Sequence, residues 1–164
     1  MWLRNAPPGW TVWFINSKGE KSVVAEGFRP NGVTLWPKEE TLVVTDGDRP
    51  HLWTFRVEAD GSLSNQAPYY RPLQIPAGRD KPGSDGMKVD DEYRLYVATA
   101  AGIQMFDPTG RLGGTILKPE PNKPLSNFVF GGPKFDILYA TCGDKVFRRQ
   151  VKPVSRPYFL RNNK

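Results

Sequence analysis

"SDGMKVDDEYRLYVAT", residues 84–99, places a small polar anchor before a short apolar stretch, a charged turn and a β-run that closes on a threonine. The same layout recurs in "NGVTLWPKEETLVVT", which begins at residue 31, and in "NFVFGGPKFDILYAT", which begins at residue 127. The anchor precedes the closing threonine by 14 positions each time, in the pairs Asn31 and Thr45, Asp85 and Thr99, and Asn127 and Thr141. A spacing kept three times predicts a structural repeat rather than three unrelated turns.

Each threonine is followed by a second strand-like run that contains a phenylalanine: "HLWTFRV", "IQMFD" and "KVFRRQV". Alternating apolar residues and frequent turn signals are typical of antiparallel sheets. Successive anchors at positions 31, 85 and 127 lie 54 and 42 residues apart, near the length of one four-stranded propeller blade. The sequence therefore predicts an all-β chain, part of a β-propeller with about three four-stranded blades. Each innermost strand would start just after its anchor.

The N-terminal stretch "TVWFINSKGEKSVV", residues 11–24, has the pattern of the end of a blade whose beginning is missing. Three full units and such a remnant would leave the ring open, with unpaired strand edges. We therefore expect a partial propeller over residues 1–152 that is truncated at its N-terminal side. A basic C-terminal tail, residues 153–164, would follow it.

The length and composition of the chain indicate a single domain rich in turns. It has 164 residues, with 16 glycines and 16 prolines, and amphipathic helical runs are scarce. The lone cysteine, Cys142, excludes an internal disulfide and a thiolate metal cluster, and we expect it to be packed. No stretch approaches the roughly 18 apolar residues that a membrane helix needs, and the N-terminus lacks the apolar core of a secretory signal. A cytoplasmic location is the default expectation, with the compartment of a longer parent left open.

The formal net charge of +6 is concentrated near the C-terminus. After Asp144 there are seven basic and no acidic residues, which leaves 16 of the 23 basic residues against all 17 acidic ones. A basic tail can bind polyanions such as nucleic acids. The rest of the chain, however, lacks a basic face with interleaved aromatic residues. We expect a solvated end and no nucleic-acid partner.

The three anchors, Asn31, Asp85 and Asn127, would line one mouth of the central channel if each begins an innermost strand. Amide and carboxylate oxygens are hard ligands suited to Ca²⁺, Mg²⁺ or Mn²⁺. The alternative is that the Asn-Gly and Asp-Gly pairs are only turns. The single histidine, His51, has no second His or Cys to complete a zinc site, so we expect it to be structural or on the surface.

Together these motifs resemble the gluconolactonase and regucalcin (senescence marker protein) family of six-bladed propellers. "GFRPNGVTLWPKEETLVVTD" is similar to the family's Pro-Asn-Gly segment, and "GSDGMKVDDEYRLYVAT" to its Asp-Gly-Met segment. "LSNFVFGGPKFDILYATCGDKVFR" is similar to the following blade, with its Phe-Gly-Gly signature. The likeness runs from about Val12 to Lys152 and would correspond to the C-terminal half of that fold.

The resemblance implies a metal-dependent lactone hydrolase, often of sugar lactones, of which this chain would be a fragment. Asn31 and Asp85 would be metal ligands, and Asp85 would also be the catalytic base. Asn127 and Asp46 would contact substrate hydroxyls, with a turn-capping role as the alternative for Asp46. The ion would be divalent, with Ca²⁺ the first choice and Mg²⁺, Mn²⁺ or Zn²⁺ the alternatives. The family also takes a glutamate ligand from its first blade, for which this chain has no counterpart.

Two hypotheses of different classes follow. In the first, the chain is part of a lactone hydrolase whose ring is completed by a missing N-terminal half or by self-association, and its ligand is a small-molecule lactone. In the second, it is a non-catalytic partial propeller that acts as a binding or interaction module. The retained Asn31 and Asp85 favour the first hypothesis, whereas the missing glutamate favours the second.

Overall fold

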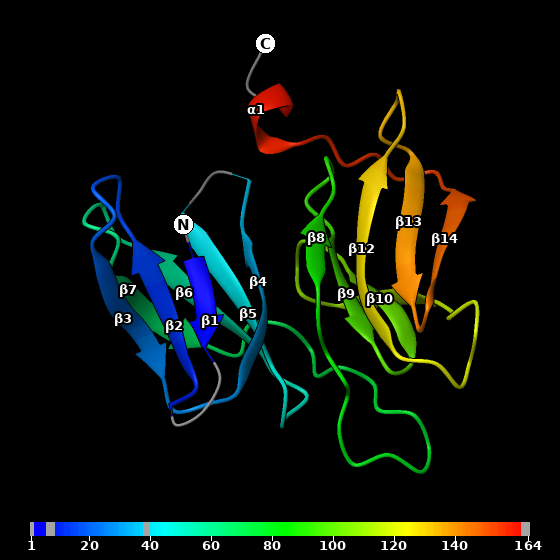
Figure 1. Cartoon of the computed structure of the whole chain (residues 1–164), viewed down its shortest axis with the longest axis horizontal. Coiled ribbons are helices and arrows are strands. Elements are labelled where there is room, and N and C mark those ends of the chain that lie inside the picture. Colours follow the sequence, from blue (N-terminus) through cyan, green and yellow to red (C-terminus); the bar gives the residue numbers. More distant parts are fainter. Residues whose placement is uncertain (1, 6–8, 38–39, 162–164) are drawn as a thin grey trace.

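The computed structural model describes residues 2–5, 9–37 and 40–161, which form antiparallel sheets and one short helix (Figure 1). The first sheet contains β1 (Trp2–Asn5), β2 (Thr11–Ile15) and β3 (Lys21–Glu26). The second contains β4 (Pro30–Leu35), β5 (Thr41–Asp46), β6 (Leu52–Val57) and β7 (Leu63–Ala67). The third contains β8 (Met87–Val89), β9 (Leu95–Thr99), β10 (Gly102–Phe106) and β11 (Leu112–Ile116). The fourth contains β12 (Leu125–Gly131), β13 (Ile137–Cys142) and β14 (Lys145–Gln150).

Within each sheet the strands follow one another in chain order, each antiparallel to the next. This up-and-down order is that of a propeller blade, and it confirms the predicted all-β, partial-propeller architecture. Two details differ from the prediction. The first sheet includes a strand, β1, that the sequence pattern did not indicate. The last unit has three strands rather than four among the described residues, because the chain turns away after β14.

Hydrophobic side chains pack between consecutive sheets and so form three core layers. Strand β5 contributes to two of them, since Leu42 and Val44 face the first sheet while Val43 faces the third. Strand β9 does the same, because side chains on a strand point alternately to its two faces. A strand buried on both faces has an uninterrupted apolar run, which is why "TLVVT" and "RLYVAT" stood out in the sequence.

The fixed distance from anchor to threonine has a geometric cause. In the last sheet Asn127 and Thr141 lie directly opposite each other across the β12–β13 ladder. In the second sheet Pro30 pairs with Asp46, which brings Asn31 beside Thr45. Fourteen residues are thus the length of the first hairpin of a blade, measured from the start of its inner strand to the end of the next. The structure confirms the repeat. The 14-residue spacing follows from the length of the hairpin, so by itself it indicates the fold and not a ligand-binding site.

Residues that follow β14 run back across the ends of β13 and β12 to α1 (Tyr158–Arg161) (Figure 1). Ser155 is buried and donates its hydroxyl to the Val89 carbonyl at 2.7 Å. The Arg156 side chain contacts the Asp91 carboxylate at 2.6 Å. The expectation of a solvated end is therefore wrong for residues 153–161, because these contacts fasten them to the β8–β9 turn. No helix among the described residues is long and apolar enough to cross a membrane.

This attachment can be measured through Ser155. Ser155→Ala removes the hydrogen bond to the Val89 carbonyl, and we expect the free energy of unfolding to fall by about 1 kcal/mol. Urea denaturation measures the change. Ser17→Ala is the control, because Ser17 is exposed in a turn and a surface change of this kind shifts stability by at most about 0.5 kcal/mol. Equal effects of the two substitutions would contradict the attachment.

Candidate active site

The three anchors lie together where the innermost strands begin. Asn31 lies in β4, Asp85 lies two residues before β8, and Asn127 lies in β12. These strands are neighbours, since β8 contacts both β4 and β12. The Asn31 side chain donates from Nδ2 to the carbonyl oxygen of Ser84, at 2.9 Å, and so joins the first anchor to the segment that carries the second.

The Asp85 segment is held from both sides by backbone hydrogen bonds. The Asp85 N–H donates to Ala98 O at 2.9 Å, and the Ala98 N–H returns a bond of the same length to Gly86 O. The Gly86 N–H points the other way and donates to Ser126 O at 3.0 Å, in the next blade. Asp85 and Gly86 are therefore not the corner of a hairpin, and Asn31 and Gly32 lie within β4. The turn alternative is wrong for both pairs.

Both glycines allow backbones of successive blades to approach closely. A Cβ atom on Gly32 would lie 2.0 Å from the Asp85 carbonyl oxygen, and a Cβ atom on Gly86 would lie 2.1 Å from Asn127 Oδ1. At Gly32 the facing atom belongs to the backbone, so only glycine fits there, whereas at Gly86 the facing atom is the end of the Asn127 side chain, which would have to move. The Asn-Gly and Asp-Gly pairs thus place three anchors in lateral contact.

Two of the closing threonines support the anchor segments directly. Thr45 Oγ1 accepts the Gly32 N–H at 2.7 Å. Thr141 Oγ1 accepts the Asn127 N–H at 3.1 Å and contacts the Asn127 carbonyl oxygen at 3.0 Å. Thr99 differs, because its hydroxyl donates to Gly102 O within its own hairpin.

The sequence matches the SMP-30/gluconolactonase/LRE-like region over residues 3–144, which is most of the chain. The chain belongs to this family. Its similarity to a gluconolactonase of Zymomonas mobilis is 28% identity over 145 residues, 86% of this chain and 40% of that protein. A lactonohydrolase of Aspergillus oryzae is 26% identical over 147 residues and is covered over 29% of its length.

Solved structures of the family superpose well on this chain. A gluconolactonase of Xanthomonas campestris gives a TM-score of 0.72 at 25% identity, with 88% of this chain and 46% of that chain covered. A calcium-binding regucalcin of Agrobacterium tumefaciens gives a TM-score of 0.74 at 15% identity, over 90% of this chain and 54% of that one. At that identity the second likeness concerns the fold alone. The chain spans half or less of the curated relatives and of the Xanthomonas enzyme.

The side-chain oxygens of the three anchors fit a hard cation only in part. Because Asn31 donates its Nδ2 to Ser84 O, its amide oxygen Oδ1 faces away from that carbonyl. Asp85 adds a half-buried carboxylate. Asn127 Oδ1 already accepts the Phe128 N–H at 2.8 Å, so it is less suited to a metal. Within residues 9–37 and 40–161, no three His, Cys, Asp or Glu side chains gather where they could hold an ion.

Asp46 occupies the position that the turn-capping interpretation predicts. The residue is 1% exposed, and Oδ1 accepts the Asp48 N–H at 3.0 Å while Oδ2 accepts the Trp53 Nε1–H at 3.2 Å. Its backbone oxygen accepts the Ser84 hydroxyl, at 3.0 Å, and so ties the second blade to the Asp85 segment. Contact of Asp46 with a substrate stays a prediction.

Ser84 and Lys88 are two features that sequence reasoning missed. Ser84 is buried and links two blades through its hydroxyl and its carbonyl. Lys88 lies in β8 between buried Met87 and Val89, and burial lowers the pKa of its ammonium group. The sequence signal that could have identified Lys88 is a charged residue between two apolar residues of a predicted strand. The packed state of Cys142 and the structural role of His51, whose ring contacts Trp53, agree with the sequence.

A larger hollow lies away from the anchors. A cavity of about 620 Å³ is bounded by Trp36, Arg56 and Tyr70, and none of the three anchors lines it. Size alone would place a binding site there. The anchors, by contrast, bring an amide and a carboxylate-bearing segment together at the start of adjacent inner strands, and we therefore place the candidate active site there.

Proposed function

We propose that this chain is the portion of a metal-dependent lactone hydrolase that carries two metal ligands and the catalytic base. One observation carries the proposal: the amide of Asn31 and the carboxylate-bearing segment of Asp85 meet at the start of adjacent inner strands, in a member of a gluconolactonase family. Its substrate would be a small lactone, as the name of the Zymomonas relative suggests.

Asn31 and Asp85 would hold the ion through their side-chain oxygens. Ca²⁺ is our first choice because it takes 6–8 oxygen ligands in flexible geometry, and Mg²⁺, Mn²⁺ or Zn²⁺ are the alternatives. When bound, the ion would polarise the lactone carbonyl and stabilise the negative charge that develops on its oxygen. Two protein ligands leave the shell incomplete. The remaining oxygens would come from water and from residues outside this chain, in a longer polypeptide or a second copy.

Asp85 would act as the general base. Its carboxylate takes a proton from water as the water oxygen attacks the carbonyl carbon, and this step gives the C–O bond of the new acid. The ring C–O bond then breaks, and the proton passes to the alkoxide that leaves. The product is an open-chain hydroxy acid. Asn127, which is exposed at the same end of β12, would orient substrate hydroxyls, and Asp46 would act mainly by fixing the loop beside them.

Metal removal tests the proposal. We expect the chain with its ring completed, by a second copy or by the N-terminal half, to release acid from glucono-δ-lactone above the spontaneous rate when Ca²⁺ is present. This activity should be lost on chelation with EDTA and regained with excess Ca²⁺. A pH-stat in weak buffer measures the release. Activity that survives chelation would contradict metal dependence. A folded chain that is inactive with all four metals would not be a hydrolase by itself.

A second candidate, a binding module without chemistry, is favoured by one observation. The described part of the chain gathers no cluster of acidic or histidine ligands, so its own residues supply only part of a metal shell. In that case Asp85→Ala would leave the affinity for a ligand or partner unchanged. The same substitution would remove Ca²⁺ binding if the hydrolase proposal is right.

A further inference from the structure

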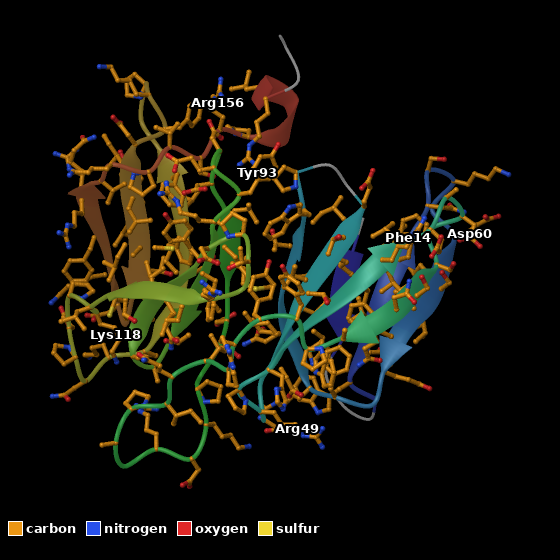
Figure 2. The ribbon with its side chains drawn as sticks, turned by 180° about the vertical axis from the view of Figure 1, so that it is seen from behind. Phe14, Arg49, Asp60, Tyr93, Lys118 and Arg156 are labelled. Atoms are coloured by element: carbon orange, nitrogen blue, oxygen red, sulfur yellow. The ribbon has the colours of Figure 1, made fainter. Side chains whose placement is uncertain are left out.

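A second cavity lies at the opposite end of the inner strands. It has a volume of about 340 Å³, and its walls come from the far end of β4, from β8, from β12 and from the C-terminal segment. The lining residues used below are Trp36, Lys88, Val129, Phe130, Arg156 and Arg161. Figure 2 shows Arg156 beside α1, whereas Arg49, which follows β5 on the anchor side, lies at the other end of the molecule.

The cavity carries an excess of positive charge. Three cationic side chains line it, namely Lys88, Arg156 and Arg161. One carboxylate, Asp91, partners both arginines, with Arg156 Nε at 2.6 Å from Oδ2 and Arg161 Nε at 3.2 Å from Oδ1. Three positive charges against one negative charge leave a local excess of about two, which favours an anion.

Lys88 is the cation whose charge is least compensated. Its Nζ donates to the Met87 carbonyl oxygen at 2.9 Å, which is a neutral acceptor. Lys88 takes part in none of the ion pairs formed among the described residues. Burial lowers the pKa of this ammonium group, a sign that the charge is costly there. An anion in the cavity would offset that cost.

The remaining walls are apolar and aromatic. Trp36 directly follows β4 and Phe130 lies in β12, so the two rings come from different blades, and Val129 adds an aliphatic surface. A volume of about 340 Å³ is at the lower end of the range for small-ligand pockets. The cavity therefore suits an anion with a compact apolar body better than a strongly hydrated ion such as inorganic phosphate.

We infer that this cavity is a binding site for a small organic carboxylate with an aromatic or aliphatic body. The carboxylate would pair with the Lys88 ammonium, and the apolar body would lie between Trp36 and Phe130. The C-terminal segment closes the site and contributes Arg156 to it. The site is distinct from the proposed metal ligands, because neither Asn31 nor Asp85 lines it, and it needs no metal.

Phenylacetate and its neutral analogue phenylacetamide distinguish charge recognition from simple apolar burial. We would titrate each into the full chain by calorimetry, at low salt and with EDTA present, and would add inorganic phosphate as a third probe. We expect saturable binding of phenylacetate that is at least tenfold tighter than binding of the amide. Equal affinities for acid and amide, no saturable binding of phenylacetate, or phosphate binding as tight as phenylacetate would each overturn the inference.

Substitutions then locate the site. Lys88→Met keeps most of the side-chain volume and should weaken phenylacetate binding at least tenfold, whereas Lys134→Met, at an exposed lysine, should not change it. Asp85→Asn should also leave it unchanged, which separates this site from the proposed active site. Binding that is unaffected by Lys88→Met would overturn the assignment. If that variant does not fold, Lys88→Gln with a thermal melt replaces it, and the acid–amide comparison on the unmodified chain still decides.

Discussion

Asp85→Asn is expected to reduce lactone hydrolysis by about 10²–10⁴-fold, the range of a general base. The amide that replaces the carboxylate cannot take a proton from water, and it also removes the one negative charge among the three anchors, Asn31, Asp85 and Asn127. Ca²⁺ affinity should therefore fall at least tenfold in the same variant. The backbone bonds of residue 85 to Ala98 do not involve the side chain, so the β8–β9 pairing should survive.

Calorimetry with Ca²⁺ and pH-stat assays measure the two effects on one preparation. The control is Asp80→Asn, which makes the same chemical change five residues away at an exposed position in the loop that precedes β8. Loss of activity and of Ca²⁺ binding in Asp85→Asn, with both retained in Asp80→Asn, is the expected result. Full Ca²⁺ affinity in Asp85→Asn would remove Asp85 from the ligand set, and full activity would remove it as the base.

The repeat was the part of the fold that the sequence alone could predict. Asn127 and Thr141 face each other across β12 and β13, so their separation in sequence equals the length of the hairpin between them. When the hairpin recurs, the separation recurs with it and can be read from the sequence. Because equal positions in successive blades lie side by side, the meeting of Asn31 with the Asp85 segment could be expected as well.

Long-range packing was not predictable in the same way. Arg156 contacts Asp91, which lies 65 residues earlier in the sequence, and no periodic pattern in the C-terminal segment indicates so distant a partner. The basic composition there indicated a solvated end, yet a buried Ser155 and a shared carboxylate hold it against the β8–β9 turn. The cavity around Lys88 depends on that attachment, so it too could be found only in the folded chain.

The role of Asp46 shows a second limit. An aspartate after a strand is a common cap, and the same residue type is a common ligand for substrate hydroxyls. Local sequence cannot separate the two roles, because the decision depends on which N–H groups reach the carboxylate. Here the N–H groups of Asp48 and the Trp53 indole both do, and they lie two and seven residues away.

Gly32→Ala is expected to lower the free energy of unfolding by about 2–3 kcal/mol, as overpacking does in a tight interior. The added methyl group would lie 2.0 Å from the Asp85 carbonyl oxygen, and a backbone atom held by its neighbours cannot turn aside. The Asp85 segment must therefore move away from β4. This movement should break the Asn31–Ser84 hydrogen bond, and Ca²⁺ binding should weaken together with stability.

Two further alanine substitutions make the test quantitative. In Gly86→Ala the methyl group meets the side-chain oxygen of Asn127, which can rotate at the cost of its bond to the Phe128 N–H, so the loss should be about 1 kcal/mol. Gly114→Ala on β11 has open space around the new methyl group and should change stability by at most about 0.5 kcal/mol. Urea denaturation should rank the losses in the order Gly32, Gly86, Gly114. If Gly32→Ala proves as mild as Gly114→Ala, the blades do not approach each other this closely, and the proposed pairing of Asn31 with Asp85 at one metal ion fails with that contact.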